Sequence, residues 1–169
     1  MAPDLLETFE SALDGLGVTH ERTTAADLPE TVTGAVSEPA VGAELPWDEL
    51  SLENTPVDQS PTPAALQSAA TGVTAAGAGI ANSGSLIVQS RPGGDEPVSL
   101  YPPFHVAVVR ARDLVETVSD AMAWLANEFD AGRRSAVLTT GPSATADMGE
   151  LITGVHGPGA VHVVSVTDA

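Results

Sequence analysis

Residues 105–139, HVAVVRARDLVETVSDAMAWLANEFDAGRRSAVLT, contain the clearest structural pattern in the chain. The valine-rich run His105–Arg110 predicts a buried strand. Over Asp113–Phe129 apolar side chains recur every three or four positions and predict an amphipathic helix: Leu114, Val115, Val118, Ala121, Met122, Leu125 and Phe129. The spacing of Asp113 and Glu116 predicts a capping box at its start. A second apolar run, Ser135–Thr139, predicts the next strand.

The neighbouring segments extend this pattern. Upstream, the small apolar stretches Val73–Ile80 and Leu86–Val88 predict strands on either side of a tight turn. Thr62-Pro63 predicts the start of a helix over 63–70, and Val161–Val166 predicts a last strand. Strands alternating with helices are typical of parallel βαβ units. We therefore expect an α/β fold in one domain, with a mostly parallel sheet flanked by helices.

Residues 1–60 are different in character and carry 13 of the acidic residues and one arginine. Leucine and phenylalanine at helical spacing predict a helix over Asp4–Leu16. Short strands are predicted at Val18–Arg22, Val32–Val36 and Leu50–Leu52, in or before a stretch rich in proline and glutamate. We expect residues 1–60 to supply an N-terminal helix and an irregular acidic layer, and residues 61–169 to form the α/β core.

The charge balance separates several classes of function. The chain has 169 residues, with 23 acidic residues against six basic ones, all arginine, and a net charge of −17. Such a surface repels phosphate backbones and argues against nucleic-acid binding. The acids are spread along the chain, which favours adaptation to a salt-rich cytosol over an acidic docking tail. The net charge therefore predicts a halophilic protein.

Other residue types exclude further classes. The chain has no cysteine, so it offers no thiolate for an iron–sulfur cluster, a zinc finger or a nucleophile. Its four histidines, His20, His105, His156 and His162, follow no metal-binding spacing, and no dinucleotide or Walker motif is present. We expect no metal and no cofactor. No stretch of ~18 apolar residues predicts a membrane span, and the acidic N-terminus does not resemble a signal peptide, so a cytoplasmic location is expected.

The residues that could carry chemistry lie near the C-terminus. TGPSATADM, residues 140–148, follows the predicted strand Ser135–Thr139, and GVHGP, residues 154–158, comes shortly after. Ligands bind beyond the carboxyl ends of strands in open α/β sheets. We expect Ser143 or Thr145 to cap a short helix whose free N–H groups bind an anion such as a carboxylate or phosphate.

The candidate binding residues come from three loops. They are Gly141, Ser143, Thr145 and Asp147 in the first, His156 and Gly157 in the second, and the turn Asn82, Ser83 and Gly84 as a third wall. Simpler roles stay open: Ser143 and Thr145 as helix caps, Asp147 as a brace for the loop, and His156 as a structural residue. A Ser–Asp–His triad is disfavoured because Ser143 lacks the nucleophile-elbow context.

GPSATADM (residues 141–148) and GVHGP (154–158), followed by a hydrophobic strand, resemble the signature of the LUD-domain family, of the lactate-utilisation protein C type, here in a haloarchaeal form. GIANSGSL (79–86) and YPPFH (101–105) resemble two further landmarks of that family, so the resemblance covers about residues 70–166. It implies a fold like that of NagB, RpiA and the CoA-transferases. It also implies an accessory or ligand-binding role in oxidising L-lactate to pyruvate beside separate iron–sulfur subunits.

The sequence departs from the family pattern at two places that bear on function. The family usually has arginine at the position of Ala144, so a potential anion partner is missing. CoA-transferases of this fold use a glutamate nucleophile at a strand-end turn. If Asn82 occupies that position, its amide cannot act as the nucleophile. A sugar-phosphate isomerase or CoA-transferase-like enzyme, and a regulatory module that senses a small anion, remain alternatives.

Overall fold

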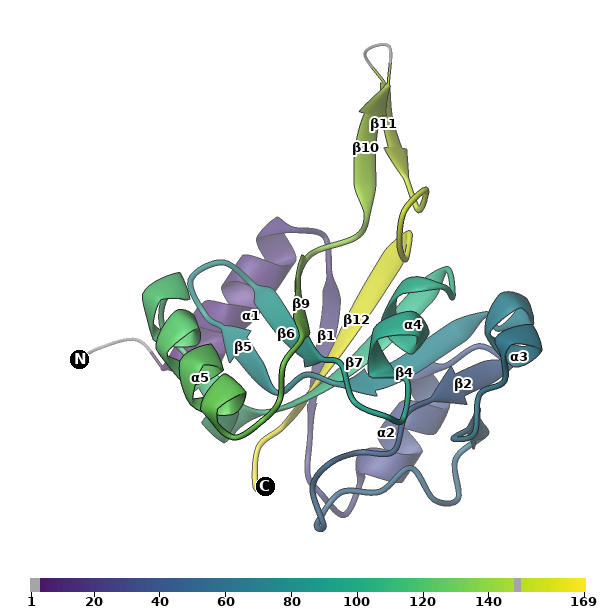
Figure 1. Cartoon of the computed structure of the whole chain (residues 1–169), viewed down its shortest axis with the longest axis horizontal. Coiled ribbons are helices and arrows are strands. Elements are labelled where there is room, and N and C mark those ends of the chain that lie inside the picture. Colours follow the sequence, from purple (N-terminus) through teal and green to yellow (C-terminus); the bar gives the residue numbers. More distant parts are fainter. Residues whose placement is uncertain (1–3, 148–149) are drawn as a thin grey trace.

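Six strands form one parallel sheet at the centre of the molecule (Figure 1). The computed structural model describes residues 4–147 and 150–169. In spatial order, the strands are β1 (Thr19–Thr23), β12 (Ala160–Val166), β7 (Phe104–Arg110), β4 (Thr71–Ala75), β2 (Ala40–Gly42) and β3 (Val57–Asp58). Every neighbouring pair is parallel. The expected α/β fold with a mostly parallel sheet flanked by helices is confirmed.

The central strand β7 is buried on both faces, as expected for a parallel sheet with two covered faces. Val106 and Val108 join the core on one face, which is covered by α2 (Leu28–Ala35) and the segment 43–57. Ala107 and Val109 join the core on the other face, beneath α1 (Leu5–Gly15). Valine at both faces therefore explains why this strand was evident from sequence.

Two short helices cover the rest of the sheet. α3 (Pro63–Ser68) begins after Thr62, whose hydroxyl accepts a hydrogen bond from the Ala65 amide. α4 (Asp95–Leu100) packs against β4, where a side chain at Gly72 would collide with the Val98 carbonyl oxygen at 2.1 Å. Glycine at this position is what lets the helix approach the sheet.

A second, four-stranded sheet lies beside the first, in the order β8 (Leu114–Val115), β5 (Ala78–Ile80), β6 (Ser85–Gln89) and β9 (Ala136–Thr140). Strand β6 is antiparallel to both β5 and β9. Helix α5 (Val118–Asp130) packs on this sheet through Ala121 and Leu125. A β-hairpin, β10 (Ala144–Asp147) and β11 (Glu150–Thr153), projects away from the body (Figure 1).

Several expected elements differ from the structure. Residues 32–36 do not form a strand: Leu28 and Val32, one helical turn apart, are both fully buried by α2. Residues 50–52 lie outside any strand. The expected strand Val73–Ile80 is divided between β4 and β5, because Ala76 pairs with Val108 and Gly77 pairs with Ile87 of the other sheet.

The helix after β7 also begins later than expected. Residues 111–113 form a 3-10 turn, and Leu114–Val115 form β8. The capping box is made by Thr117 and Asp120 instead of Asp113 and Glu116. Asp113 accepts a hydrogen bond from Arg110, so its carboxylate serves an ion pair instead of a helix start.

Two features are absent from the part of the chain that the structure describes. Among the helices of residues 4–147 and 150–169, none has the length and apolar character needed to cross a membrane. In the same part of the chain, no group of three or more histidine, aspartate or glutamate side chains is arranged to hold a metal ion.

Candidate functional site

The loop after β9 and the loop before β12 are joined at Ser143. The Ser143 amide donates a hydrogen bond of 2.8 Å to the Pro158 carbonyl, and the Ser143 carbonyl accepts one of 2.9 Å from the Gly154 amide. Gly157 packs directly on this residue: a Cβ at Gly157 would lie 3.2 Å from Ser143 Cβ. These contacts bring together the two segments that the sequence singled out.

The local conformation of both loops depends on backbone geometry. Gly141 has φ of +68° and Gly154 has φ of +79°, a region that favours glycine. The Pro103 carbonyl accepts a hydrogen bond of 2.9 Å from the Gly159 amide, which fixes the second loop at the start of β12. Backbone conformation and backbone hydrogen bonds therefore fix both loops where they meet at Ser143.

A cavity of about 230 Å³ lies at this junction. Gly141, Ser143, His156 and Gly157 of the predicted set line it. The remaining lining residues are Leu100, His105, Val137, Leu138, Thr139, Thr140, Pro142, Pro158 and Val161. Among these described lining residues none is acidic and the only titratable side chains are two imidazoles, so the cavity is apolar with a few hydrogen-bonding groups.

His105 lines the cavity from β7 and is almost completely buried. Its Nε2 lies 2.8 Å from Thr74 Oγ1 of β4, in hydrogen-bond contact. Burial lowers the pKa of His105 to about 4 from its usual 6.5, because the interior disfavours the charged ring. The ring is therefore neutral near pH 7. His156, on the opposite loop, is exposed.

The position of this cavity differs from the expected one. It borders the carboxyl end of β9, as predicted, but β9 is an antiparallel edge strand of the second sheet. His105 and Val161 are each the second residue of a parallel strand. The parallel sheet thus presents its amino ends here, and its carboxyl ends lie elsewhere.

The expected short helix after Gly141 is wrong. Residues 144–147 form β10, whose backbone pairs with β11, and Thr145 is opposite Ile152. Thr145 and Asp147 therefore belong to the hairpin, and Thr145 is not among the residues that line the cavity. Met148 lies outside the described residues. The Ser143 amide is already bonded to Pro158, so an anion here would rely on side chains instead of helix N–H groups.

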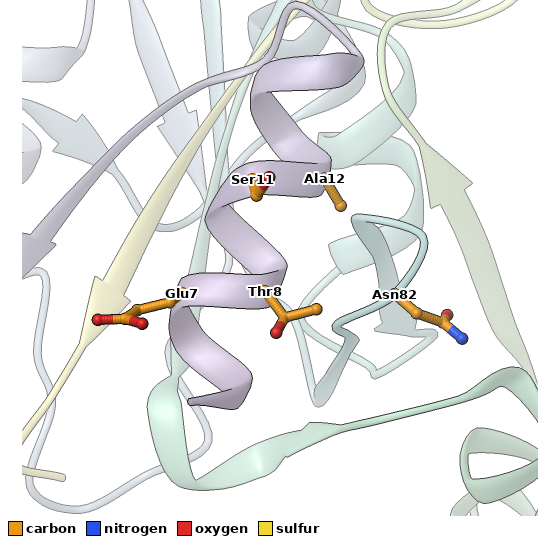
Figure 2. A pocket seen from close by; sticks show the side chains of 5 residues that line it. All are labelled: Glu7, Thr8, Ser11, Ala12 and Asn82. Carbon is orange, nitrogen blue, oxygen red and sulfur yellow. The ribbon is translucent and has the colours of Figure 1, made fainter. Parts of the chain in front are cut away.

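The turn Asn82-Ser83-Gly84 does not form a third wall of this cavity. Figure 2 shows Asn82 on a turn that faces α1, where it borders an open hollow with Glu7, Thr8, Ser11 and Ala12. Gly84, with φ of +64°, lies against the α1 backbone, and a Cβ there would be 3.2 Å from the Leu13 nitrogen. Gly84 therefore has a packing role.

Ser83 nevertheless connects to the cavity through a chain of hydroxyls. Ser83 Oγ lies 2.8 Å from Ser85 Oγ, which lies 2.7 Å from Thr140 Oγ1, and Thr140 lines the cavity. Ser85 and Thr140 are opposite each other in the β6–β9 pairing. The turn thus supports one wall indirectly.

The sequence motifs do not include His105, Leu100 or the β9 residues, which the fold adds to this site. His105 ends the YPPFH segment and, like the other three histidines, follows no metal-binding spacing. The available signal was a histidine inside an otherwise apolar strand, which needs a buried partner. That partner, Thr74, is 31 residues away in sequence.

Fold and site together define the class: a mixed α/β protein whose GPS and HGP loops meet over a small cavity at the edge of a parallel sheet. A model of the LUD domain matches residues 6–166, and the chain belongs to the LUD-domain family.

Named relatives share most of this length. A "Lactate utilization protein C" of Deinococcus radiodurans is 30% identical over 96% of this chain and 80% of its own. Another, from Geobacillus, is 26% identical over 98% of this chain and 79% of its own. The crystal structure of a DUF162 family protein from Deinococcus radiodurans superposes with a TM-score of 0.72, 26% identity and 96% coverage of both chains.

Proposed function

We propose that this chain acts in the utilisation of lactate or a related small organic acid, and that it binds the carboxylate in the cavity beneath Ser143 and His156. The observation that carries the proposal is the lining of that cavity. The chain has a net charge of −17, yet none of the described lining residues is acidic. An anion there avoids the direct repulsion that most of the surface would impose.

The chemistry of the lining fits a small hydroxy acid. Among the lining residues, Ser143 and Thr139 carry hydroxyls and His156 carries an exposed ring that can hydrogen-bond the acid, whereas the Thr140 hydroxyl is already bonded to Ser85. Apolar side chains such as Leu100 and Val161 would contact the carbon skeleton. The names of the Deinococcus and Geobacillus relatives support lactate as the first acid to test.

We propose an accessory or ligand-binding role, at a cytoplasmic location, beside separate iron–sulfur subunits. The chain has no cysteine, so electrons taken from lactate would need clusters held by another chain. In this scheme the cavity presents or senses the acid, and the partner subunits carry the redox chemistry.

Direct binding tests the site. L-Lactate titrated into the protein in ~2 M KCl, followed by NMR, should perturb signals of residues 141–143 and 156–158 in a saturable manner. Ser143→Ala and His156→Ala should each weaken binding about tenfold, the loss of a hydrogen bond to a charged group. Thr145→Ala and His20→Ala are matched controls outside the cavity and should bind as the wild type does. Unchanged binding in both cavity variants would contradict the proposed site.

The partner proposal needs the native host. A tagged chain should co-purify with iron–sulfur proteins, and the purified assembly should transfer electrons from lactate to an artificial acceptor. The same pull-down with Ser143→Ala should retain the partners and need about tenfold more lactate for half-maximal transfer. Recovery of the chain alone, under conditions in which it is folded, would contradict an accessory role in such a complex.

A further inference from the structure

A second cavity, of about 320 Å³, lies where the parallel sheet presents its carboxyl ends. Trp47 follows β2, Gly77 follows β4, and Arg110 is the last residue of β7. Ligands in open α/β sheets bind at this edge. The other lining residues are Pro46, Gln89, Arg91, Asp113, Trp124, Glu128 and Arg133.

Both tryptophans of the chain line this cavity. Trp47 stacks beneath the Arg110 guanidinium, whose central carbon is 4.6 Å from the ring centroid. Trp124 comes from α5 and approaches Gly77 so closely that a Cβ there would lie 2.9 Å from its ring. In a chain with only 4% aromatic residues, two partly exposed indoles in one cavity are a concentration of flat apolar surface.

Three of the six arginines also line it, in a protein of net charge −17. Each is held by a carboxylate: Arg91 by Asp95, Arg133 by Glu128, and Arg110 by Asp113 at 2.5 Å and by Glu49 at 3.0 Å. A guanidinium has five N–H donors, and these pairs use only some of them. The carboxylates therefore fix the orientation of the arginines and leave donors for a ligand. Because Asp113 and Glu128 also line the cavity, an anion would be held by directed hydrogen bonds from these donors and not by a net positive charge.

From this arrangement we infer that the second cavity binds a planar anion, an aromatic ring that carries a phosphate or a carboxylate. The ring would stack on Trp124, since the Arg110 guanidinium already covers one face of Trp47, and the anionic group would take the remaining donors of Arg110 and Arg133. The volume agrees with a ring-bearing ligand: at ~30 Å³ each the cavity would hold about ten water molecules, and a three-carbon acid would leave most of it empty.

The two tryptophans allow ligand binding in this cavity to be measured by fluorescence. Because both indoles line this cavity, quenching of tryptophan fluorescence reports on its occupancy. Titration with AMP and with benzoate distinguishes a phosphate from a carboxylate as the anionic group, and saturable quenching by either, below ~10 mM, supports the inference. Adenosine and inorganic phosphate, which each lack one half of the required chemistry, should bind at least tenfold more weakly than AMP if the phosphate arm is the correct one.

Adjacent arginines give a matched pair of variants. Arg133 lines the cavity and Arg134 does not, and both are exposed enough to be replaced without disturbing the core. Arg133→Gln should weaken binding of the quenching probe about tenfold, whereas Arg134→Gln should leave it unchanged. No saturable quenching by either probe, equal binding of the uncharged ring, or equal effects of the two variants would overturn the inference.

Discussion

Gly157 lies against Ser143 so closely that a methyl group on its α-carbon would stand 3.2 Å from Ser143 Cβ and 3.9 Å from Leu100 Cδ2. Both neighbours line the smaller cavity, so any side chain at Gly157 would enter it. The φ of Gly157 does not lie in the left-handed region. Glycine is therefore favoured at position 157 by lack of space and not by backbone conformation. Substitutions at this position test whether a ligand occupies the cavity.

Gly157→Ala and Gly157→Val should weaken lactate binding in that order, with the valine variant losing tenfold or more. Their unfolding free energies should stay within ~1 kcal/mol of the wild type, since crowding and reduced chain entropy act in opposite directions. Isothermal titration and urea unfolding measure the two effects. Gly159→Ala is the control, because its Cβ would meet Gly154 at an ordinary 3.6 Å. Full binding by Gly157→Val would show that the ligand sits elsewhere.

The buried pair His105–Thr74 predicts a pH-dependent stability. The pKa of His105 is about 4 in the folded chain, against 6.5 when exposed. Below pH 6.5 the unfolded state therefore binds a proton that the folded state does not, and stability falls with decreasing pH. The contribution of neutral His105 to the free energy of unfolding is complete above pH 6.5. It is lost progressively down to about pH 4, by ~1.4 kcal/mol per pH unit at most.

His105→Gln isolates this contribution, because an amide can bond Thr74 and does not titrate. Between pH 7 and pH 5, the wild type should lose about 2 kcal/mol more unfolding free energy than the variant. Urea unfolding in ~2 M KCl at both pH values provides the comparison. Carboxylates such as Glu10 and Glu128, whose pKa is lowered by hydrogen bonds from Arg22 and Arg133, titrate in both proteins and cancel. Parallel losses would contradict the assignment.

Helix α5 offers a test of where its capping box lies. Thr117 and Asp120 bond each other's backbone amides at 3.0 and 3.3 Å. Thr117→Ala should lower the unfolding free energy by ~1 kcal/mol. Glu116→Ala, at the position favoured by sequence, should change it by less than ~0.5 kcal/mol, because Glu116 is exposed and its side chain caps nothing. A larger loss of unfolding free energy in Glu116→Ala than in Thr117→Ala would instead support a helix that begins at Asp113.

The difference between expected and observed elements has a physical pattern. β7 and α5 were predictable because burial on two faces and on one helical face leaves periodic traces in sequence. The valines of residues 32–36 favoured a strand by propensity, yet Leu28 and Val32 both reach the core only in a helix. At these residues the burial of apolar side chains outweighs the intrinsic strand propensity of valine.

The sequence predicted the loop residues of the candidate site but not the strand residues that complete the cavity. Gly141 and Ser143 lie in one motif and His156 and Gly157 in another, and the fold brings the two together. The direction of β9 cannot be read from Ser135–Thr139 itself, since it depends on pairing with β6. The carboxyl edge of the parallel sheet, with Trp47 and Arg110, therefore lies away from the loops that the motifs mark.

The excess of acidic residues predicts that stability rises with salt. Five of the six arginines are already in ion pairs with carboxylates, so most of the 23 acids repel one another without a cation nearby. Raising KCl from ~0.1 M to ~2 M shortens the screening length from about 10 Å to less than 3 Å. The urea midpoint should increase strongly over this range, although screening also weakens the exposed ion pairs.

Three exposed acids between β2 and β3, Glu44, Asp48 and Glu53, provide the control. Replacing them together by glutamine and asparagine removes three negative charges from one surface segment and touches no ion pair among the described residues. The variant should unfold at a higher urea concentration than the wild type in ~0.1 M KCl and at nearly the same concentration in ~2 M, because salt already screens what the substitutions remove. A wild-type midpoint that does not change with KCl would contradict the halophilic interpretation of the net charge.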